Sequence, residues 1–369
     1  MAEFIKGMKL AESFFEEAAR PLLASRYPGL SYSAGLLGFG SDVLGYDDFT
    51  SCDHMWGPRF YLFLAPEDIG KREAIMDLFS RKLPPVYRGF SVNFSEPDPE
   101  DHGVRHAEQA DGDRISPLIY IYTETEYLNE YLGCGDLSAL RETDWLSFSE
   151  HKLLALTAGK FFQDDLKMAD RLSNLNFYPE SVRLYLIASN WSLAAEEQAF
   201  VRRCADVGDE TGSMLACARI AERLMRLAFL YCRRYAPYSK WFGTAFARLP
   251  IDPEIKERIR LSLAAPDIET REEHLVNAQL LMAKFHNELG ITEPVPVSIQ
   301  NYFERKILVI WADRMAAAVK QKLQGTVFEE MPLIGSLSEV ANFTALTEQA
   351  QLRRNIADFY DSLAQKRQR

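Results

Sequence analysis

Residues 31–64, SYSAGLLGFGSDVLGYDDFTSCDHMWGPRFYLFL, decide the fold of this chain. Two short apolar runs, Ala34 to Phe39 and Phe60 to Leu64, are rich in aromatic residues and leucine, which is typical of buried strands. A polar turn with the pair Gly40-Ser41 separates them. Such a turn leaves backbone N–H groups open, and phosphate approaches closely because glycine has no Cβ. The stretch therefore predicts a nucleotide site between two core strands.

A carboxylate follows at the start of the second run. Asp53 stands a dozen residues after Ser41, where it is expected to hold Mg²⁺ against a bound phosphate. Gly-Ser, eleven intervening residues and then Asp resembles the signature of the nucleotidyltransferase superfamily that includes DNA polymerase β and the antibiotic nucleotidyltransferases. In that scheme Gly40 and Ser41 hold the β- and γ-phosphates, and Arg59 helps to neutralise the leaving pyrophosphate.

Six further motifs, in order, resemble an uncharacterised bacterial family catalogued as domain of unknown function forty thirty-seven, which is nucleotidyltransferase-like. They are GSDVLGYDD, DHMWGPR, HKLLALTAG, YPESVRLYLIASNW, VGDETGS and RRYAPYSKWFGTAFARL. The likeness spans roughly residues 38–249, and several ordered motifs are more specific than one. It implies transfer of a nucleoside monophosphate from a nucleoside triphosphate, with ATP expected, to a small hydroxyl-bearing acceptor that the resemblance does not identify.

Two positions depart from the superfamily pattern. The second carboxylate, two residues after Asp53, is replaced by Met55, and a thioether is a poor ligand for a hard cation. The third carboxylate, expected on the later strand FSVNF, is replaced by Asn93. The Mg²⁺ ligands are then Asp53 and Asn93, or carboxylates from the neighbouring loops. The alternative stays open that the chain is a catalytically degenerate nucleotide-sensing or partner-binding protein.

Composition limits the partners. The 369 residues carry a formal net charge of -11, which argues against a broad nucleic-acid surface and suits a small cationic acceptor. The five cysteines form no CxxC pair, so no disulfide framework is expected and a cytoplasmic location is predicted. Acidic residues interrupt the apolar pattern of the N-terminus, and no apolar run approaches the ~20 residues of a membrane helix.

The predicted fold class is α+β, with three parts. Residues 1–125 form a small mixed-sheet, nucleotidyltransferase-like domain with helices at 5–24 and 66–84 and later strands at 86–94 and 116–123. Residues 126–293 show apolar spacing of three to four residues, which predicts a helical bundle without strands. Residues 294–369 are expected to form a strand and helices that return to the first domain or cap the bundle.

Within the bundle, basic and aromatic residues gather. Arg219, Arg223 and Arg226 share one helix face and either join a structural network with nearby acidic residues or face phosphate. Lys240-Trp241 looks like the Lys-Trp element with which helical domains of related nucleotidyltransferases touch the triphosphate. We expect this segment to contact the nucleotide through Tyr238, Ser239, Lys240 and Trp241. Glu197 or Glu210 is the expected base that deprotonates the acceptor hydroxyl.

Overall fold

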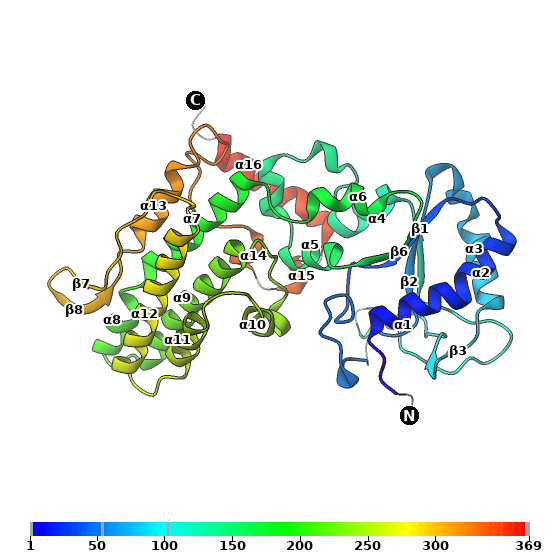
Figure 1. Cartoon of the computed structure of the whole chain (residues 1–369), viewed down its shortest axis with the longest axis horizontal. Coiled ribbons are helices and arrows are strands. Elements are labelled where there is room, and N and C mark those ends of the chain that lie inside the picture. Colours follow the sequence, from blue (N-terminus) through cyan, green and yellow to red (C-terminus); the bar gives the residue numbers. More distant parts are fainter. Residues whose placement is uncertain (1–2, 53–54, 102, 342, 348, 366–369) are drawn as a thin grey trace. The chain divides into compact units, whose positions relative to one another are not determined.

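The computed structural model describes residues 3–52, 55–101, 103–341, 343–347 and 349–365 (Figure 1). Contacts divide the chain into two compact units. The first, which we call the sheet unit, comprises Met1–Ala139 and Lys152–Asn176, and the second, the helical unit, comprises Leu140–His151 and Phe177–Arg369. The fold is α+β, as predicted. The segment 152–176, which the sequence pattern assigns to the bundle, belongs to the sheet unit.

The sheet unit is built on a four-stranded mixed sheet in the order β5-β2-β1-β6. Its strands are β1 (Tyr32–Leu36), β2 (Phe60–Leu64), β5 (Ile119–Tyr122) and β6 (Lys160–Asp164). β1 pairs antiparallel with β2 and β6, while β2 pairs parallel with β5. Every residue of β1 and β2 is buried. The two apolar runs of the opening stretch are therefore the central strands.

Alternate residues of the strands supply the two faces of the sheet. Phe60 and Leu62 share one core with the N-terminal helix and with α3 (Arg72–Lys82). The N-terminal helix consists of α1 (Gly7–Phe14), a π turn over Phe15–Ala19 and α2 (Arg20–Arg26). Tyr61 lies on the other face and packs edge-on against Tyr127 of α4 (Glu124–Leu132).

Two strand predictions were wrong. The sequence pattern predicts no strand after residue 125, yet β6 forms an edge of the sheet because KFFQD, although partly polar and only half-buried, pairs along β1. The segment 86–94 does not join the main sheet. Only Val86–Tyr87 (β3) and Phe90–Ser91 (β4) are strands, and they pair with each other in a separate hairpin.

Long helices make up the helical unit (Figure 1). In the bundle they are α7 (Glu180–Glu197), α8 (Phe200–Asp206), α9 (Glu210–Tyr231), α10 (Ser239–Ala247), α11 (Pro253–Ala264) and α12 (Ile268–Glu288). The helices α5 (Glu150–Thr157) and α6 (Met168–Leu172) precede them in the chain; α6 belongs to the sheet unit, and the boundary between the two units falls within α5. In the described part of the chain, no helix combines the length and the apolar character that a membrane span requires.

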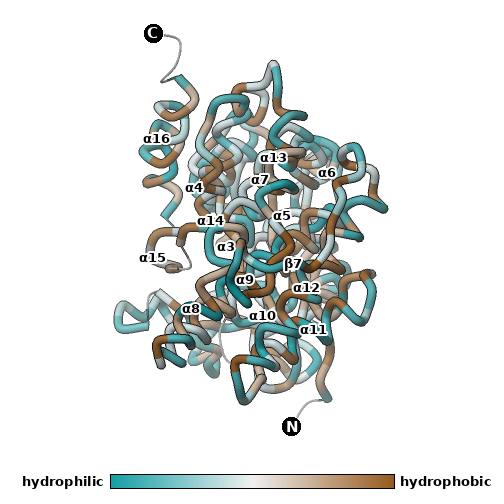
Figure 2. Tube along the Cα trace, turned by 90° about the vertical axis from the view of Figure 1, so that its left-hand side faces the viewer, coloured by the Kyte–Doolittle hydropathy of each residue, from teal (hydrophilic) through white to brown (hydrophobic). Residues whose placement is uncertain are grey.

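The C-terminal segment completes the bundle. The hairpin β7 (Gln300–Tyr302) and β8 (Arg305–Val309) leads into α13 (Asp313–Gln321), which packs along α7. The short helices α14 (Leu337–Val340) and α15 (Thr344–Thr347) follow, and α16 (Arg353–Gln365) packs on residues 142–147. Figure 2 shows hydrophilic and hydrophobic residues in alternation along α16, as expected for a helix with one buried face.

Buried polar side chains tie three bundle helices together. Trp191 of α7 donates through Nε1 to the Tyr231 hydroxyl of α9 over 2.7 Å, and that hydroxyl lies 2.9 Å from Nδ1 of His286 on α12. Burial lowers the pKa of His286 to about 4, so the imidazole is neutral at physiological pH. The network satisfies polar groups that would otherwise destabilise the core.

Candidate functional site

The sharp turn after β1, residues 38–42, is the first candidate site, and we call it the glycine turn. Gly38 and Gly40 have φ of +92° and +104°, a conformation that favours glycine. At Gly40 a Cβ would lie 2.2 Å from Oδ1 of Asp42 and 2.5 Å from Nη2 of Arg59. The turn therefore brings its backbone directly against a charged pair, and only glycine fits there.

That charged pair is almost completely buried. Arg59 donates from Nη2 to Oδ1 of Asp42 over 2.8 Å and to the Phe39 carbonyl over 2.7 Å, and both charged side chains are 1% exposed. The Arg59 guanidinium also stacks 4.1 Å from the centre of the Phe39 ring. The residue expected to neutralise pyrophosphate thus already has an anionic partner, Asp42. Its Nη1 is buried and, among the described residues, has no hydrogen-bond partner.

Two backbone N–H groups of the glycine turn are open. Within the described residues, the amides of Gly40 and Ser41 have no hydrogen-bond acceptor, whereas the Ser41 carbonyl accepts from the amides of Tyr46 and Asp47. Successive open amides in a turn with left-handed residues form a concave site for anions. The predicted pair Gly40-Ser41 therefore has the backbone chemistry expected of a phosphate site.

The loop carboxylates near this turn serve the fold. Asp47 is buried, accepts from the Gly7 amide over 2.6 Å and pairs with Lys6 at 3.2 Å. Asp48 caps the short helix Phe49–Ser51. Asp53, the predicted metal ligand and catalytic residue, lies outside the described residues, as does its neighbour His54.

Asn93, the other predicted metal ligand, holds a loop in place. Its Oδ1 accepts from the Ser116 amide over 2.8 Å, and its Nδ2 donates to the Gln109 carbonyl over 3.3 Å. In the part of the chain that the structure describes, no three His, Cys, Asp or Glu side chains gather as metal ligands would. The amide group of Asn93 is thus engaged by backbone groups on both of its polar atoms.

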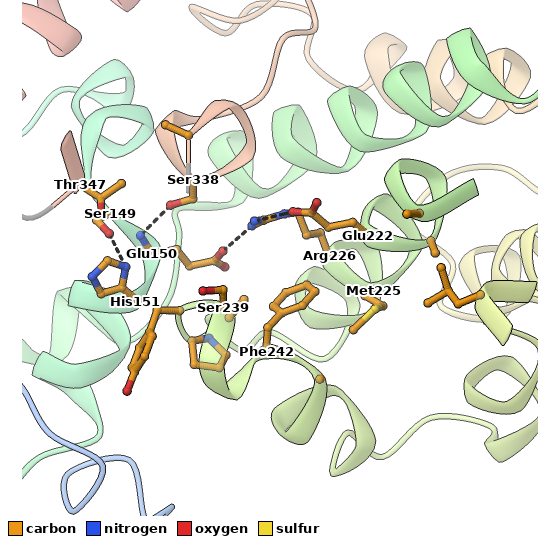
Figure 3. Close-up of a pocket in the computed structure, with 18 residues that line it drawn as sticks. Ser149, Glu150, His151, Glu222, Met225, Arg226, Ser239, Phe242, Ser338 and Thr347 are labelled. Carbon is orange, nitrogen blue, oxygen red and sulfur yellow. Dashed lines mark hydrogen bonds and ion pairs between the residues drawn. The ribbon is translucent and has the colours of Figure 1, made fainter. Parts of the chain in front are cut away.

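A second candidate site is a pocket of about 370 Å³ in the helical unit (Figure 3). Its polar side chains come from the start of α5, from α9, from the start of α10, and from α14 and α15. The pocket is lined by Ser149, Glu150, His151, Ala218, Ala221, Glu222, Met225, Arg226, Ala236, Pro237, Tyr238, Ser239, Phe242, Gly243, Leu263, Ser338, Ala341 and Thr347. We call it the α9 pocket. Of the predicted nucleotide contacts, Tyr238 and Ser239 line it, while Lys240 and Trp241 do not.

Charged side chains occupy one wall of the α9 pocket (Figure 3). Arg226 lies between two carboxylates, 2.9 Å from Oε1 of Glu222 through Nη2 and 3.4 Å from Oε2 of Glu150 through Nη1. Burial raises the pKa of Glu150 to about 7, although Arg226 opposes that shift. The Ser149 hydroxyl lies 2.7 Å from Nδ1 of His151 beside this group.

The predicted general bases are engaged elsewhere. Glu197 binds Arg219 at 2.7 Å, and Glu210 at the start of α9 binds the buried Arg271 at 2.5 Å. Neither lines the α9 pocket. Arg219 therefore takes part in a structural ion pair, which is one of the two roles predicted for the arginine face. The Nζ of Lys240 lies 5.1 Å from the centre of the Trp241 ring.

Sequence reasoning missed Glu150 as a pocket residue. It stands at the edge of the quoted motif HKLLALTAG, and no periodicity relates it to Glu222 and Arg226 on α9. The four-residue spacing of Glu222 and Arg226 was a usable signal, because it permits an ion pair on one helix face.

Comparisons with known proteins give two findings. The crystal structure of a nucleotidyltransferase-like protein from Exiguobacterium sibiricum is similar at 12% sequence identity and a TM-score of 0.32, over 80% of this chain and 98% of that chain. No curated protein matches the chain. Residues 145–242 match the model of a family described as "Domain of unknown function (DUF4037)". The predicted resemblance to this family is thus confirmed over residues 145–242, where the chain is similar to the family model.

Proposed function

We propose that the chain is a nucleotidyltransferase that holds its nucleoside triphosphate, expected to be ATP, at the glycine turn. The observation that carries the proposal is the pair of open amides at Gly40 and Ser41, backed by the buried guanidinium of Arg59. Open backbone N–H groups in a turn bind phosphate oxygens, and Arg59 fixes this turn through its bonds to Asp42 and the Phe39 carbonyl. The sequence resemblance, Gly40-Ser41 followed by Asp53, points to the same chemistry.

The residues of the turn would act by positioning. The amides of Gly40 and Ser41 and the Ser41 hydroxyl would donate to phosphate oxygens, and Arg59 would hold the turn in place through Asp42 and the Phe39 carbonyl. The oxygen of a small acceptor's hydroxyl would form a bond to the α-phosphorus as the bond to pyrophosphate breaks, and the hydroxyl proton would pass to the leaving pyrophosphate. Positioning and preorganised charge account for most of the rate enhancement in chemistry of this type.

A second function is favoured by Asn93 and Met55. The amide of Asn93 is occupied by backbone groups, and Met55 replaces a carboxylate of the superfamily pattern. Both features suit a protein that binds nucleotide without turnover, as a sensor or a partner-binding module.

Titration calorimetry with ATP, GTP, CTP and UTP tests nucleotide binding. Ser41→Leu should weaken triphosphate binding by about tenfold or more, because the larger side chain covers the open amides. Ser25→Leu, an exposed position on α2, is the matched control and should bind as the wild type does. Equal affinity in the two variants would remove the glycine turn from the proposal.

Release of pyrophosphate, measured with a panel of hydroxylated and aminated acceptors, separates the two functions. An enzyme should release pyrophosphate, and Asp53→Asn should abolish release while most of the nucleotide affinity remains. Wild-type protein that binds nucleotide and releases none with any acceptor would establish the second function instead.

A further inference from the structure

The α9 pocket has the size and walls of a small-molecule site. Its volume of about 370 Å³ lies in the range of ligand pockets, which are mostly apolar with a few convergent polar groups. Ala221 and Met225 of α9 and Phe242 of α10 form much of the apolar wall. Leu263, which also lines the pocket, is 52% exposed.

The charged wall of the pocket selects the sign of a ligand. The Glu222 carboxylate accepts from Nε and Nη2 of Arg226 over 3.0 and 2.9 Å, and the Glu150 carboxylate accepts from Nη1 over 3.4 Å. One face of the same guanidinium lies 5.3 Å from the centre of the Phe242 ring. Each nitrogen of Arg226 is therefore taken up by a carboxylate, and little of the guanidinium is left for an anion.

The two carboxylates together carry more charge than Arg226 neutralises. Arg223 of α9 donates through Nη2 to the backbone carbonyl of Glu339 of α14 over 3.1 Å, and the Glu339 carboxylate opposes the burial that lowers the pKa of Arg223. The group of Glu150, Glu222, Glu339, Arg223 and Arg226 thus has a net charge of about -1 when all its members are ionised.

We propose that the α9 pocket binds a small molecule with an apolar body and a protonated amine, and that the amine pairs with Glu222 and Glu150. The apolar wall would bury the body of the ligand. An ammonium group would complete the charge balance, with the rings of Phe242 and Tyr238 adding cation–π attraction. The inference does not depend on nucleotide binding at the glycine turn.

Binding should strengthen as pH rises through the titration of Glu150. Burial raises the pKa of this carboxyl to about 7, Arg226 lowers it and Glu339 raises it. Other titratable groups also lie near the Glu150 carboxyl: they are Glu222 of α9, the hydroxyls of Tyr178 and Tyr235, and the neighbouring His151. An alkyl ammonium keeps its proton to about pH 10, so affinity for an amine should rise by up to about tenfold between pH 6 and 8.

A matched set of probes tests the proposal on the full-length protein. 2-Phenylethylamine, 2-phenylethanol and phenylacetate share one ring and differ in the charge of the end group. Titration followed by ligand-observed NMR should give a Kd of about 1 mM or tighter for the amine, with weaker binding of the alcohol and none of the carboxylate. The inference is overturned if phenylacetate binds best, if amine and alcohol bind equally, or if none of the three binds.

Variants assign the binding to this pocket. Glu222→Gln should weaken amine binding about tenfold. Glu254→Gln is the matched control, because Glu254 forms the same i,i+4 pair with Arg258 away from the pocket. Gly243 lines the pocket, and a Cβ at this position meets no atom within 4 Å. Gly243→Leu should therefore place an apolar side chain in the pocket without a change of charge, and it should abolish binding of every probe.

The pH response has its own control. Glu150→Gln should remove the rise in affinity between pH 6 and 8, while His151→Asn should keep it. Thermal unfolding of each variant shows whether it is folded. Amine binding that survives in folded Gly243→Leu protein, or a pH response that survives in Glu150→Gln, would contradict the assignment.

Discussion

Arg59 shows how one residue serves both the fold and the candidate site. Its guanidinium and the Asp42 carboxylate are buried together beneath the glycine turn. Burial of two charges is unfavourable unless they pair well, and loss of one partner leaves the other charged in a medium that solvates it poorly. The pair therefore fixes the conformation of the turn more than it adds to overall stability.

Replacing Arg59 alone should be far more damaging than replacing both partners. Arg59→Leu leaves Asp42 without its cation and should lower the free energy of unfolding by about 3–5 kcal/mol. The double variant Asp42→Asn, Arg59→Leu removes the stranded charge and should recover part of that loss. Urea unfolding of the two proteins measures the difference, and equal stability of the single and double variants would show that the pair is not coupled.

At the scale of elements, the sequence predicts what is regular. The apolar runs of β1 and β2 are continuous and buried, so composition alone identifies them. The strand β6 has no such pattern, because only Phe161 and Phe162 of its five residues are apolar. Arg59 binds Asp42, which is 17 residues away in sequence, and Asn93 binds Ser116, which is 23 residues away. Neither spacing corresponds to a helical or strand period, so the sequence pattern could not predict these contacts.

A close backbone approach holds β6 on the sheet. The register between β1 and β6 shifts at Ala34/Gly35, and a Cβ on Gly35 would lie 2.5 Å from the Lys160 carbonyl oxygen and 3.0 Å from the Phe161 Cα. Both contacts are to backbone atoms, which cannot move aside as a flexible side chain does. The strand pairing at this point therefore requires glycine.

Gly35→Ala should push β6 away from β1 and lower the free energy of unfolding by about 1–3 kcal/mol. Gly70→Ala is the control in the same unit, because a Cβ at Gly70 meets no atom within 4 Å. Urea unfolding gives the stabilities, and hydrogen exchange of the β6 amides reports the local effect. A Gly35→Ala protein as stable as Gly70→Ala, with unchanged exchange, would argue against this close contact.

At the scale of the whole molecule, the chain does not form its two units one after the other. The chain passes between the two units after residues 139, 151 and 176, so the sheet unit is assembled from two separate segments. The edge strand β6 belongs to the second segment. A boundary placed where the strand signals end therefore cuts through the sheet.

A fragment of residues 1–176 should form the sheet, whereas a fragment of residues 1–139 should not. The shorter fragment lacks β6 and exposes the unpaired edge of β1, which favours association with other chains. Size-exclusion chromatography and circular dichroism compare the two. A monomeric, cooperatively folded fragment 1–139 would show that β6 is dispensable.

The same interrupted path has a consequence for synthesis on the ribosome. Residues 1–139 leave the ribosome before the last strand of their own sheet has emerged from it, since β6 ends at Asp164. At about 5–20 residues per second, the missing 25 residues take roughly 1–5 s. During that interval the nascent chain presents β1 with one free edge, so this is the period in which a chaperone would protect it best.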